Sequence, residues 1–361
     1  MRRTITGRHA YTGRGALSNP PGRFDRQQLE AVDDGWYQDE VPDSLPTTLE
    51  PDKAREVIST NDSPDVPFEQ SINPYRGCSH ACPYCYARPS HAYMGLSPGL
   101  DFETRLFYKA DAARVLESQL SRPGYVCKSI TLGANTDPYQ PDEKRMGITR
   151  SILEVLARTH HPVAVITKSA LVLRDLDLLA AMARLGLASV AVSVTTLDAD
   201  LKRVMEPRAA SPQARLRALA ALTAAGIPTA VMAAPVIPAL TDHELEGILE
   251  AAAAVGVQSA GYVLLRLPYE IKDLFKEWLE AHFPERAAHV MSLIRAMRGG
   301  RENDPRFGSR MRGTGPFAQL LNNRFRLACQ RLNLNRGRRE ALTTALFTPP
   351  QPVGSQLRLG L

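Results

Sequence analysis

Short apolar runs and helical patterns alternate through the middle of the chain. Runs rich in β-branched residues lie at 126–133, 162–168, 187–196, 228–234 and 259–267, with an earlier candidate at 68–75. Between them, apolar residues recur at helical spacing over 111–120, 149–158, 171–186, 211–226 and 241–256. Strands that alternate with helices of this length are typical of βαβ units in a parallel sheet. We expect an α/β fold, either an open sheet or a partial TIM-like (β/α)6 barrel, and favour the barrel.

Two of the predicted helices have recognisable ends. Ser211 and Thr241 are suitable N-cap residues at their starts. Gly226 and Gly256 follow the last turn of each helix, where a glycine in the left-handed backbone conformation commonly ends a helix. These signals predict where the helices begin and end.

The pattern changes at both ends of the chain. Residues 1–60 are rich in Gly, Pro, Asp and Arg without sustained periodicity, which predicts an extended and partly disordered arm. After about residue 284 the pattern becomes helical, and the last residues again look like a tail. We therefore expect a barrel over 61–284, a helical C-terminal extension over 285–347 and a tail over 348–361.

The composition is that of a soluble globular protein. Hydrophobic residues make up 44% of the 361 positions and charged residues 23%, which is ordinary for this class. No apolar run reaches the length needed to span a bilayer, so we expect no membrane association. The basic N-terminus has no apolar stretch behind it, which argues against a secretory signal. The cytoplasm is the expected location.

Three of the five cysteines lie within eight residues. Cys78, Cys82 and Cys85 follow the first candidate strand, at the strand end where α/β folds place reactive groups. The odd number of cysteines and their close spacing favour a metal site over a disulfide framework. One alternative is a structural zinc site with His80 or His91 as the fourth ligand. The other is a four-iron cluster, in which three thiolates leave one iron open to a small molecule.

The spacing C-x3-C-x2-C, with Tyr84 just before the last cysteine, resembles the signature of radical S-adenosylmethionine (SAM) enzymes. The resemblance implies a 4Fe-4S cluster whose open iron chelates SAM. It also implies reductive cleavage of SAM, which gives a 5′-deoxyadenosyl radical that abstracts hydrogen from a substrate. The cofactors supply this chemistry, while the protein positions them and excludes water.

Beyond the cysteines, the chain resembles the branch that contains spore photoproduct lyase and the so-called DNA repair photolyases. The resemblance is strongest to a bacterial subgroup with the stretches SPDVPFEQSINPYRGC, YARPSHAY and NTDPYQP. It implies that Lys168 and Ser193, each at a strand end, hold the carboxylate of SAM. The resemblance also implies that the backbone of Ala234 contacts the adenine of SAM.

Further cofactor contacts are expected around these positions. Many radical SAM enzymes hold the SAM amino group with a Gly-Gly-Glu stretch after the second strand. This chain lacks that stretch and has GANTDPYQP after the strand predicted at 126–133. Asn135, Thr136 and Asp137 are therefore candidates for SAM or substrate contacts, with an ordinary turn as the alternative. Glu206 matches a family Glu-Pro stretch and either orients the SAM ribose or caps a helix. Tyr84 completes the expected cofactor contacts.

The resemblance departs from the lyase at one position. Ala134 stands where the lyase carries the cysteine that returns hydrogen to the product radical. Cys127 begins the same predicted strand, roughly 23 Å from its other end at about 3.3 Å per residue. Cys329 lies in an amphipathic helix and is expected to be a small core residue. The substrate therefore stays open.

Residues 295–339 contain twelve Arg and two acidic residues, interleaved with Phe307, Phe317 and Phe325. Such a segment favours nucleic acid binding, docking of a flavodoxin or ferredoxin-type electron donor, or ordinary solvated helix faces. The leading hypothesis is a radical SAM enzyme, with a nucleic acid lesion or modified base as one candidate substrate. A non-catalytic zinc module that binds nucleic acid is the alternative. The oligomeric state stays open.

Overall fold

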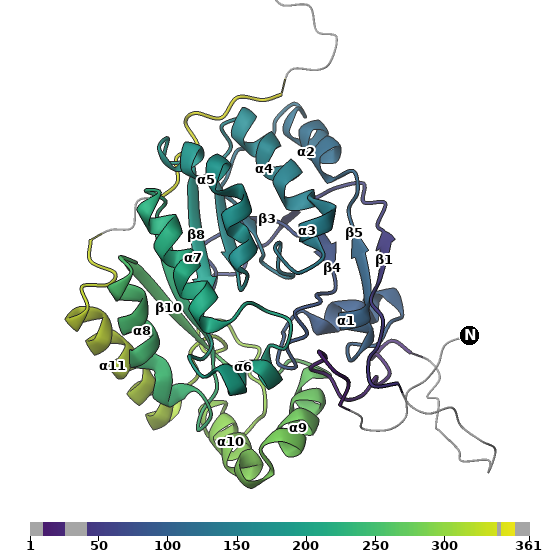
Figure 1. Cartoon of the computed structure of the whole chain (residues 1–361), viewed down its shortest axis with the longest axis vertical. Helices are drawn as coiled ribbons and strands as arrows, with labels where there is room; N and C mark the ends of the chain where they lie inside the picture. The colour runs from purple at the N-terminus through teal and green to yellow at the C-terminus, as the bar shows by residue number, and fades with distance from the viewer. Residues whose placement is uncertain (1–9, 26–41, 338–340, 351–361) are drawn as a thin grey trace, which may run out of the picture.

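A sheet of seven strands forms the centre of the molecule. The computed structural model describes residues 10–25, 42–337 and 341–350, and within them the sheet has the order β10-β9-β8-β7-β6-β3-β2 (Figure 1). Its strands are β2 (Ile58–Thr60), β3 (Gln70–Ile72), β6 (Ile130–Leu132), β7 (Val163–Thr167), β8 (Ala188–Ser193), β9 (Thr229–Val236) and β10 (Ser259–Leu264). All neighbours pair in parallel except β2 and β3. Because β2 and β10 do not pair, the barrel is open, which confirms the predicted α/β fold.

Helices connect the strands and pack against the sheet. They are η1 (Arg88–Met94), α1 (Asp101–Thr104), α2 (Ala112–Leu120), α3 (Glu143–Met146), α4 (Ile148–Arg158), η2 (Ala170–Asp175), α5 (Leu176–Ala183), α6 (Ala199–Met205), α7 (Pro212–Ala224), η3 (Asp242–Glu244) and α8 (Leu245–Ala254). The helices α4, α5, α7 and α8 follow one another around the sheet (Figure 1).

The strands form because their β-branched residues fit a covered sheet. β8 is buried at five of its six positions, and Val190 and Val192 are fully buried. Such nearly continuous burial is typical of parallel strands covered on both faces. Since parallel strands end at the same edge, their carboxyl ends present side chains to a common site.

The arm that the sequence predicted as extended makes specific contacts. β1 (Thr48–Pro51) pairs in parallel with β5 (Arg105–Tyr108), and β5 pairs with β4 (Tyr75–Arg76), which gives a second, three-stranded sheet. β2, also in this stretch, joins the main sheet. One glycine of the arm is tightly enclosed: a Cβ on Gly15 would lie 1.9 Å from the carbonyl oxygen of Ala81.

Three helices follow the last strand. They are α9 (Ile271–His282), α10 (Pro284–Met297) and α11 (Gly315–Arg331). α9 packs on α10, and α11 lies beside α8 (Figure 1). Trp278 and Phe275 of α9 are fully buried in a cluster that includes Cys82 and Tyr84, so α9 also supports the cysteine loop.

Two local predictions are corrected by the structure. The strand predicted at 126–133 covers Ile130–Leu132 alone, and Cys127 lies before it. Thr241 does not cap α8, because it precedes the short helix η3 and its hydroxyl accepts a hydrogen bond from the backbone N–H of Ile237. Ser211 does cap α7, since its hydroxyl accepts from the N–H of Ala214.

Some predictions fall partly outside the described residues. These are the first nine positions and residues 26–41 of the arm, Arg338 and Arg339 of the arginine-rich segment, and residues 351–361 of the tail. Among the residues that the structure describes, no helix combines the length and apolar character that a membrane crossing requires.

Candidate functional site

The cysteine loop begins where β3 and β4 end. Gly77, just before the first cysteine, has a φ of 77°, and a Cβ there would lie 2.8 Å from the carbonyl oxygen of Phe102. Glycine therefore lets the chain turn tightly into the loop. Cys78 and Cys82 are buried, Cys85 is partly exposed, and all three are free thiols.

The three thiols share one environment. Cys85 packs against two clusters of buried apolar residues, one that contains Cys78 and one that contains Cys82. Burial raises the pKa of the Cys78 thiol well above its usual value, and Asp137 and the other two thiols raise it further. Burial likewise raises the pKa of Cys82 and Cys85. A buried thiolate needs a positive partner, and the irons of a bound cluster would supply it. The donor set therefore fits a three-cysteine cluster.

The structure gives no support to a zinc site. Among the described residues, no group of three or more His, Cys, Asp or Glu side chains is arranged to hold a metal ion. His80 is buried, and its Nδ1 lies 3.4 Å from Asp137 Oδ2. His91 Nε2 lies 3.0 Å from the carbonyl oxygen of Arg105, and its ring packs edge-on against Phe102. His80 therefore has an acidic partner and His91 is engaged through Nε2, while the buried Nδ1 of His91 has no hydrogen-bond partner among the described residues.

A buried carboxylate lies at the centre of the adjacent polar network. Glu206 follows α6 and is fully buried. Its carboxylate accepts hydrogen bonds from the Tyr84 hydroxyl, from Thr195 Oγ1 at 2.7 Å and from the Arg215 guanidinium. Burial alone would raise the pKa of Glu206, but Arg215 and Lys168 hold it well below its usual value. Glu206 is therefore ionised at neutral pH.

Lys168 joins three strand ends. It follows β7, and its Nζ lies 3.1 Å from Glu206 Oε1. The same Nζ donates to Thr195 Oγ1 at 3.0 Å, beyond the end of β8, and to the carbonyl oxygen of Ala234 at 2.9 Å, in β9. Its charge also lies 5.7 Å from the ring centroid of Tyr84. Thus four of the expected cofactor residues, Tyr84, Lys168, Glu206 and Ala234, come together.

Ser193 ends β8 and is buried. Its carbonyl oxygen accepts a hydrogen bond from Arg215 Nη1 at 3.0 Å. Through Arg215, Ser193 is tied to the same network as Glu206. The strand end that carries Ser193 is therefore held at a fixed position beside the expected SAM site.

The residues that follow β6 hold the turn after this strand against the ends of β4 and β7. Asp137 accepts hydrogen bonds from Thr167 Oγ1 at 2.7 Å and from the N–H of Lys168 at 2.7 Å. The Thr136 hydroxyl donates to the carbonyl oxygen of Tyr75 at 2.8 Å. Asp137 and Thr136 thus position the ends of β6, β7 and β4 relative to one another. Among the described residues, the side chain of Asn135 has no hydrogen-bond partner and stays available for a ligand.

The N-terminal arm closes over the cysteine loop. The Glu103 carboxylate accepts hydrogen bonds from the N–H groups of Gly15 at 3.0 Å and Ala16 at 2.8 Å. It also pairs with Arg88, and both side chains are fully buried. Arg88 Nε donates to the carbonyl oxygen of Cys82 at 2.8 Å. The arm, Glu103, Arg88 and the cysteine loop therefore form one continuous hydrogen-bonded unit.

Sequence reasoning missed Arg215, Thr195 and Gly15. Arg215 carried a usable signal, because it occupies the buried face of α7 together with Ala218, Leu219 and Leu222. An arginine on an apolar helix face predicts a buried acidic partner. Thr195 and Gly15 carry no comparable signal.

Most arginines of the C-terminal segment already have partners. Ion pairs join Arg295 to Glu302, Arg306 to Asp304, Arg310 to Asp65, Arg324 to Glu246 and Arg331 to Glu250. Phe325 is buried and packs 4.8 Å from the ring centroid of Tyr262, while Phe307 is 57% exposed. The three phenylalanines therefore do not form a common stacking surface.

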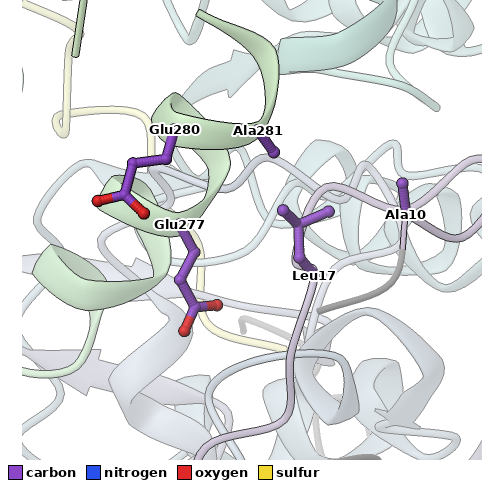
Figure 2. Close-up of a pocket in the computed structure, with 5 residues that line it drawn as sticks. All are labelled: Ala10, Leu17, Glu277, Glu280 and Ala281. Carbon is purple, nitrogen blue, oxygen red and sulfur yellow. The ribbon is translucent and has the colours of Figure 1, made fainter. Parts of the chain in front are cut away.

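A hollow between the arm and α9 lies apart from these residues. Figure 2 shows the residues that line it, which are Glu277, Glu280 and Ala281 of α9 and Leu17 and Ala10 of the arm. Glu277 Oε2 accepts a hydrogen bond from the Ser18 hydroxyl at 2.5 Å. None of the expected cofactor residues lines it.

The family model described as the Radical SAM superfamily matches residues 72–252, which is half of the chain and includes the three cysteines. The chain belongs to the radical SAM superfamily. Radical SAM enzymes use a 4Fe-4S cluster and SAM, so membership implies both cofactors.

This radical SAM protein is 41% identical over 235 residues to an uncharacterised protein of Mycobacterium tuberculosis, covering 64% of this chain and 68% of the relative. An uncharacterised protein of Methanocaldococcus jannaschii is 28% identical over 233 residues, covering 64% and 83%.

Solved structures of spore photoproduct lyase share the fold of this radical SAM protein. The lyase complexed with dinucleoside spore photoproduct superposes with a TM-score of 0.56 at 17% identity, covering 79% of each chain. A mutant lyase with bound AdoMet and the same dinucleoside has a TM-score of 0.55 at 16% identity, covering 79% of this chain and 78% of the lyase. At this identity the likeness concerns the fold alone.

Proposed function

We propose that the chain is an enzyme that cleaves SAM reductively and abstracts hydrogen from a substrate. The observation that carries the proposal is the position of the cysteine loop, with its three free thiols, beside Lys168 and Glu206 at the carboxyl ends of the parallel strands. Cys78, Cys82 and Cys85 would hold the 4Fe-4S cluster. When bound, the cluster and SAM supply an electron and a 5′-deoxyadenosyl radical.

The chain's own residues would bind and orient SAM. Lys168 offers a cation, and Ser193 a hydroxyl, to the SAM carboxylate. Ala234, in β9 beside Lys168, would contact the adenine through its backbone. Asn135 would contact SAM or the substrate directly. Thr136 and Asp137 would act by positioning, since their side-chain oxygens are already bonded within the protein.

Burial of the site serves the chemistry. Tyr84 and Glu206 are buried, and the arm packs over the cysteine loop. Such enclosure excludes water and protects a reactive intermediate from side reactions. We assign this catalytic role to residues 61–284, with residues 285–347 as a supporting extension. Reduced thiols fit a cytoplasmic protein.

The substrate that we propose is a nucleic acid, as a lesion or a modified base. The support is the shared fold with a lyase that binds a dinucleoside photoproduct. Titration of DNA binding with salt tests this proposal, because a binder of backbone phosphates loses affinity steeply as salt rises. Binding that is absent, or that does not depend on salt, would contradict it.

Anaerobic purification with iron and sulfide tests the enzyme proposal against the zinc alternative. We expect a brown protein with a reducible cluster, and 5′-deoxyadenosine after addition of SAM and dithionite. A flavodoxin or ferredoxin should replace dithionite as the electron donor. Stoichiometric zinc without SAM cleavage would overturn the proposal.

A further inference from the structure

Arg266 lies at the same edge of the sheet as the cysteine loop. It follows β10 by two residues, and its guanidinium carbon lies 5.9 Å from the ring centroid of Tyr86. Tyr86 is the residue directly after Cys85, and its hydroxyl donates to the carbonyl oxygen of Ala134 beyond β6. Arg266 therefore borders the space between the ends of β6 and β10, next to the proposed cluster.

Arg266 is partly buried, and its guanidinium lacks the partners that the fully buried arginines have. Arg88 pairs with Glu103, and Arg215 pairs with Glu206. Arg298 donates to the carbonyl oxygens of Leu265, Ser309 and Arg310. Arg266, by contrast, has no carboxylate within ion-pair distance among the described residues, and its buried Nε has no hydrogen-bond partner there.

The closest polar groups do not satisfy this charge. Among the described residues, the one side-chain hydrogen bond of Arg266 runs from Nη1 to Met311 Sδ, at 3.5 Å, and a thioether is a weak acceptor. Asp65, which attracts Arg266, already accepts from Arg310 and from the N–H of Gly308. A buried cationic donor without an acceptor is unfavourable in a folded protein, so the site is suited to an anion that arrives with a ligand.

We propose that Arg266 binds an anionic group of the substrate, a phosphate or a carboxylate, beside Tyr86. A guanidinium presents a planar fork of donors that matches either group in a bidentate arrangement. The proposal rests on the proposed function, because it takes the space beside the cluster as the substrate site. The carboxylate of SAM has its own cation in Lys168, which leaves Arg266 for a second ligand.

Proton–nitrogen NMR of the arginine Nε–H groups tests this assignment directly. The reconstituted protein with its cluster oxidised is titrated with inorganic phosphate, acetate, thymidine 5′-monophosphate, thymidine and SAM at constant ionic strength. The Arg266→Lys variant identifies the Arg266 signal, and iron content reports that the variant is folded. Arg301→Gln is the matched control, because Arg301 is an exposed arginine of the C-terminal segment.

A saturable shift of the Arg266 signal with either phosphate compound, but not with thymidine, supports a phosphate site. A shift with acetate alone supports a carboxylate site. In either case, Arg266→Gln should weaken the binding of that ligand by about tenfold or more, as loss of a charge-assisted hydrogen bond predicts, while Arg301→Gln leaves it unchanged. No shift with any anion, or a shift with SAM alone, overturns the proposal.

The outcome is separable from that of the proposed function. If the protein forms no 5′-deoxyadenosine but the Arg266 signal responds to phosphate, the enzyme proposal fails and the anion site stands. If SAM is cleaved while the Arg266 signal responds to none of the anions, the anion site alone is overturned.

Discussion

Lys168 Nζ lies 3.1 Å from Glu206 Oε1, so the cation expected to hold the SAM carboxylate already has a carboxylate partner in the protein. Glu206 has a second cationic partner in Arg215. The three ionised groups therefore carry a net charge of one positive unit. That remaining charge is what SAM would meet, and Glu206 fixes the position of Lys168 before SAM binds. Such preorganisation lowers the cost of ordering the side chain on binding.

Lys168→Ala should weaken SAM binding by tenfold or more. The substitution leaves Glu206 and Arg215 as a neutral pair, so the SAM carboxylate loses a charge-assisted hydrogen bond of about 1.5–3 kcal/mol. Equilibrium dialysis of SAM against anaerobically reconstituted protein measures the effect, with Lys128→Ala as a control because Lys128 is exposed and pairs with Glu69. Unchanged affinity with an intact cluster would refute the role assigned to Lys168.

Glu206→Gln should destabilise the protein by about 3–5 kcal/mol at neutral pH, because it leaves the buried charge of Arg215 without its counter-ion. Urea unfolding of the apo-protein at pH 7 measures the loss. Glu117→Gln, on the exposed face of α2, serves as a control and should change stability by less than about 1 kcal/mol.

The stability difference between wild type and Glu206→Gln should also depend on pH. The folded-state pKa of Glu206 lies below its value in the unfolded chain, which is about 4.3. The stabilisation is therefore complete above the unfolded-state pKa and declines as the pH falls through the folded-state pKa. Repeating the unfolding between pH 7 and pH 3 should show the two proteins converging in acid. A constant difference over this range would mean that ionised Glu206 is not the source.

The hydrophobic pattern predicted the parallel α/β sheet but overestimated one strand. Residues 126–133 have the composition of a strand, yet β6 begins at Ile130, which pairs with Val163 of β7 and Gln70 of β3. Gln70 and Val163 are the first residues of β3 and β7, so the three strands begin opposite one another. The residue before Val163 is a proline, which has no N–H to donate. Strand length thus depends on neighbours that are distant in the sequence.

The candidate site was predictable where a local motif carried it. The spacing of the cysteines, and the position of Lys168 after a strand, were visible in the sequence. The partners of Glu206 were not, because the contact with Tyr84 joins residues 122 positions apart. The packing of Gly15 on the cysteine loop was equally hidden, since a glycine in an aperiodic arm gives no sign of close contact.

Single alanine substitutions of Cys78, Cys82 and Cys85 should each abolish the cluster. Three thiolates are the full set of protein ligands in the proposed site, so two are insufficient to hold four irons. Cys127→Ala and Cys329→Ala are matched controls, because Cys127 precedes β6 and Cys329 is buried in α11. Iron and sulfide content after anaerobic reconstitution measures the outcome. Cluster loss in either control, or cluster retention in any of the three variants, would contradict the assignment.

Gly15→Ala should loosen the cysteine loop. The added Cβ would lie 1.9 Å from the carbonyl oxygen of Ala81 and 2.9 Å from Cδ of Pro83, and these two residues flank Cys82. Either the arm must withdraw or the loop must shift, at a cost of about 1–3 kcal/mol for overpacking. Because both changes expose or displace Cys82, the reconstituted cluster should also release iron to a chelator faster than in wild type.

Gly247→Ala is the matched control for this substitution. Gly247 lies inside α8, where an added Cβ meets only Leu197 Cδ1 at an ordinary 3.6 Å. Since alanine favours the helix over glycine by roughly 0.5–1 kcal/mol, this variant should be slightly more stable than wild type. Urea unfolding and the rate of iron release, measured on both variants, separate the two effects. If Gly15→Ala matches wild type in both measurements, the arm does not secure the cysteine loop.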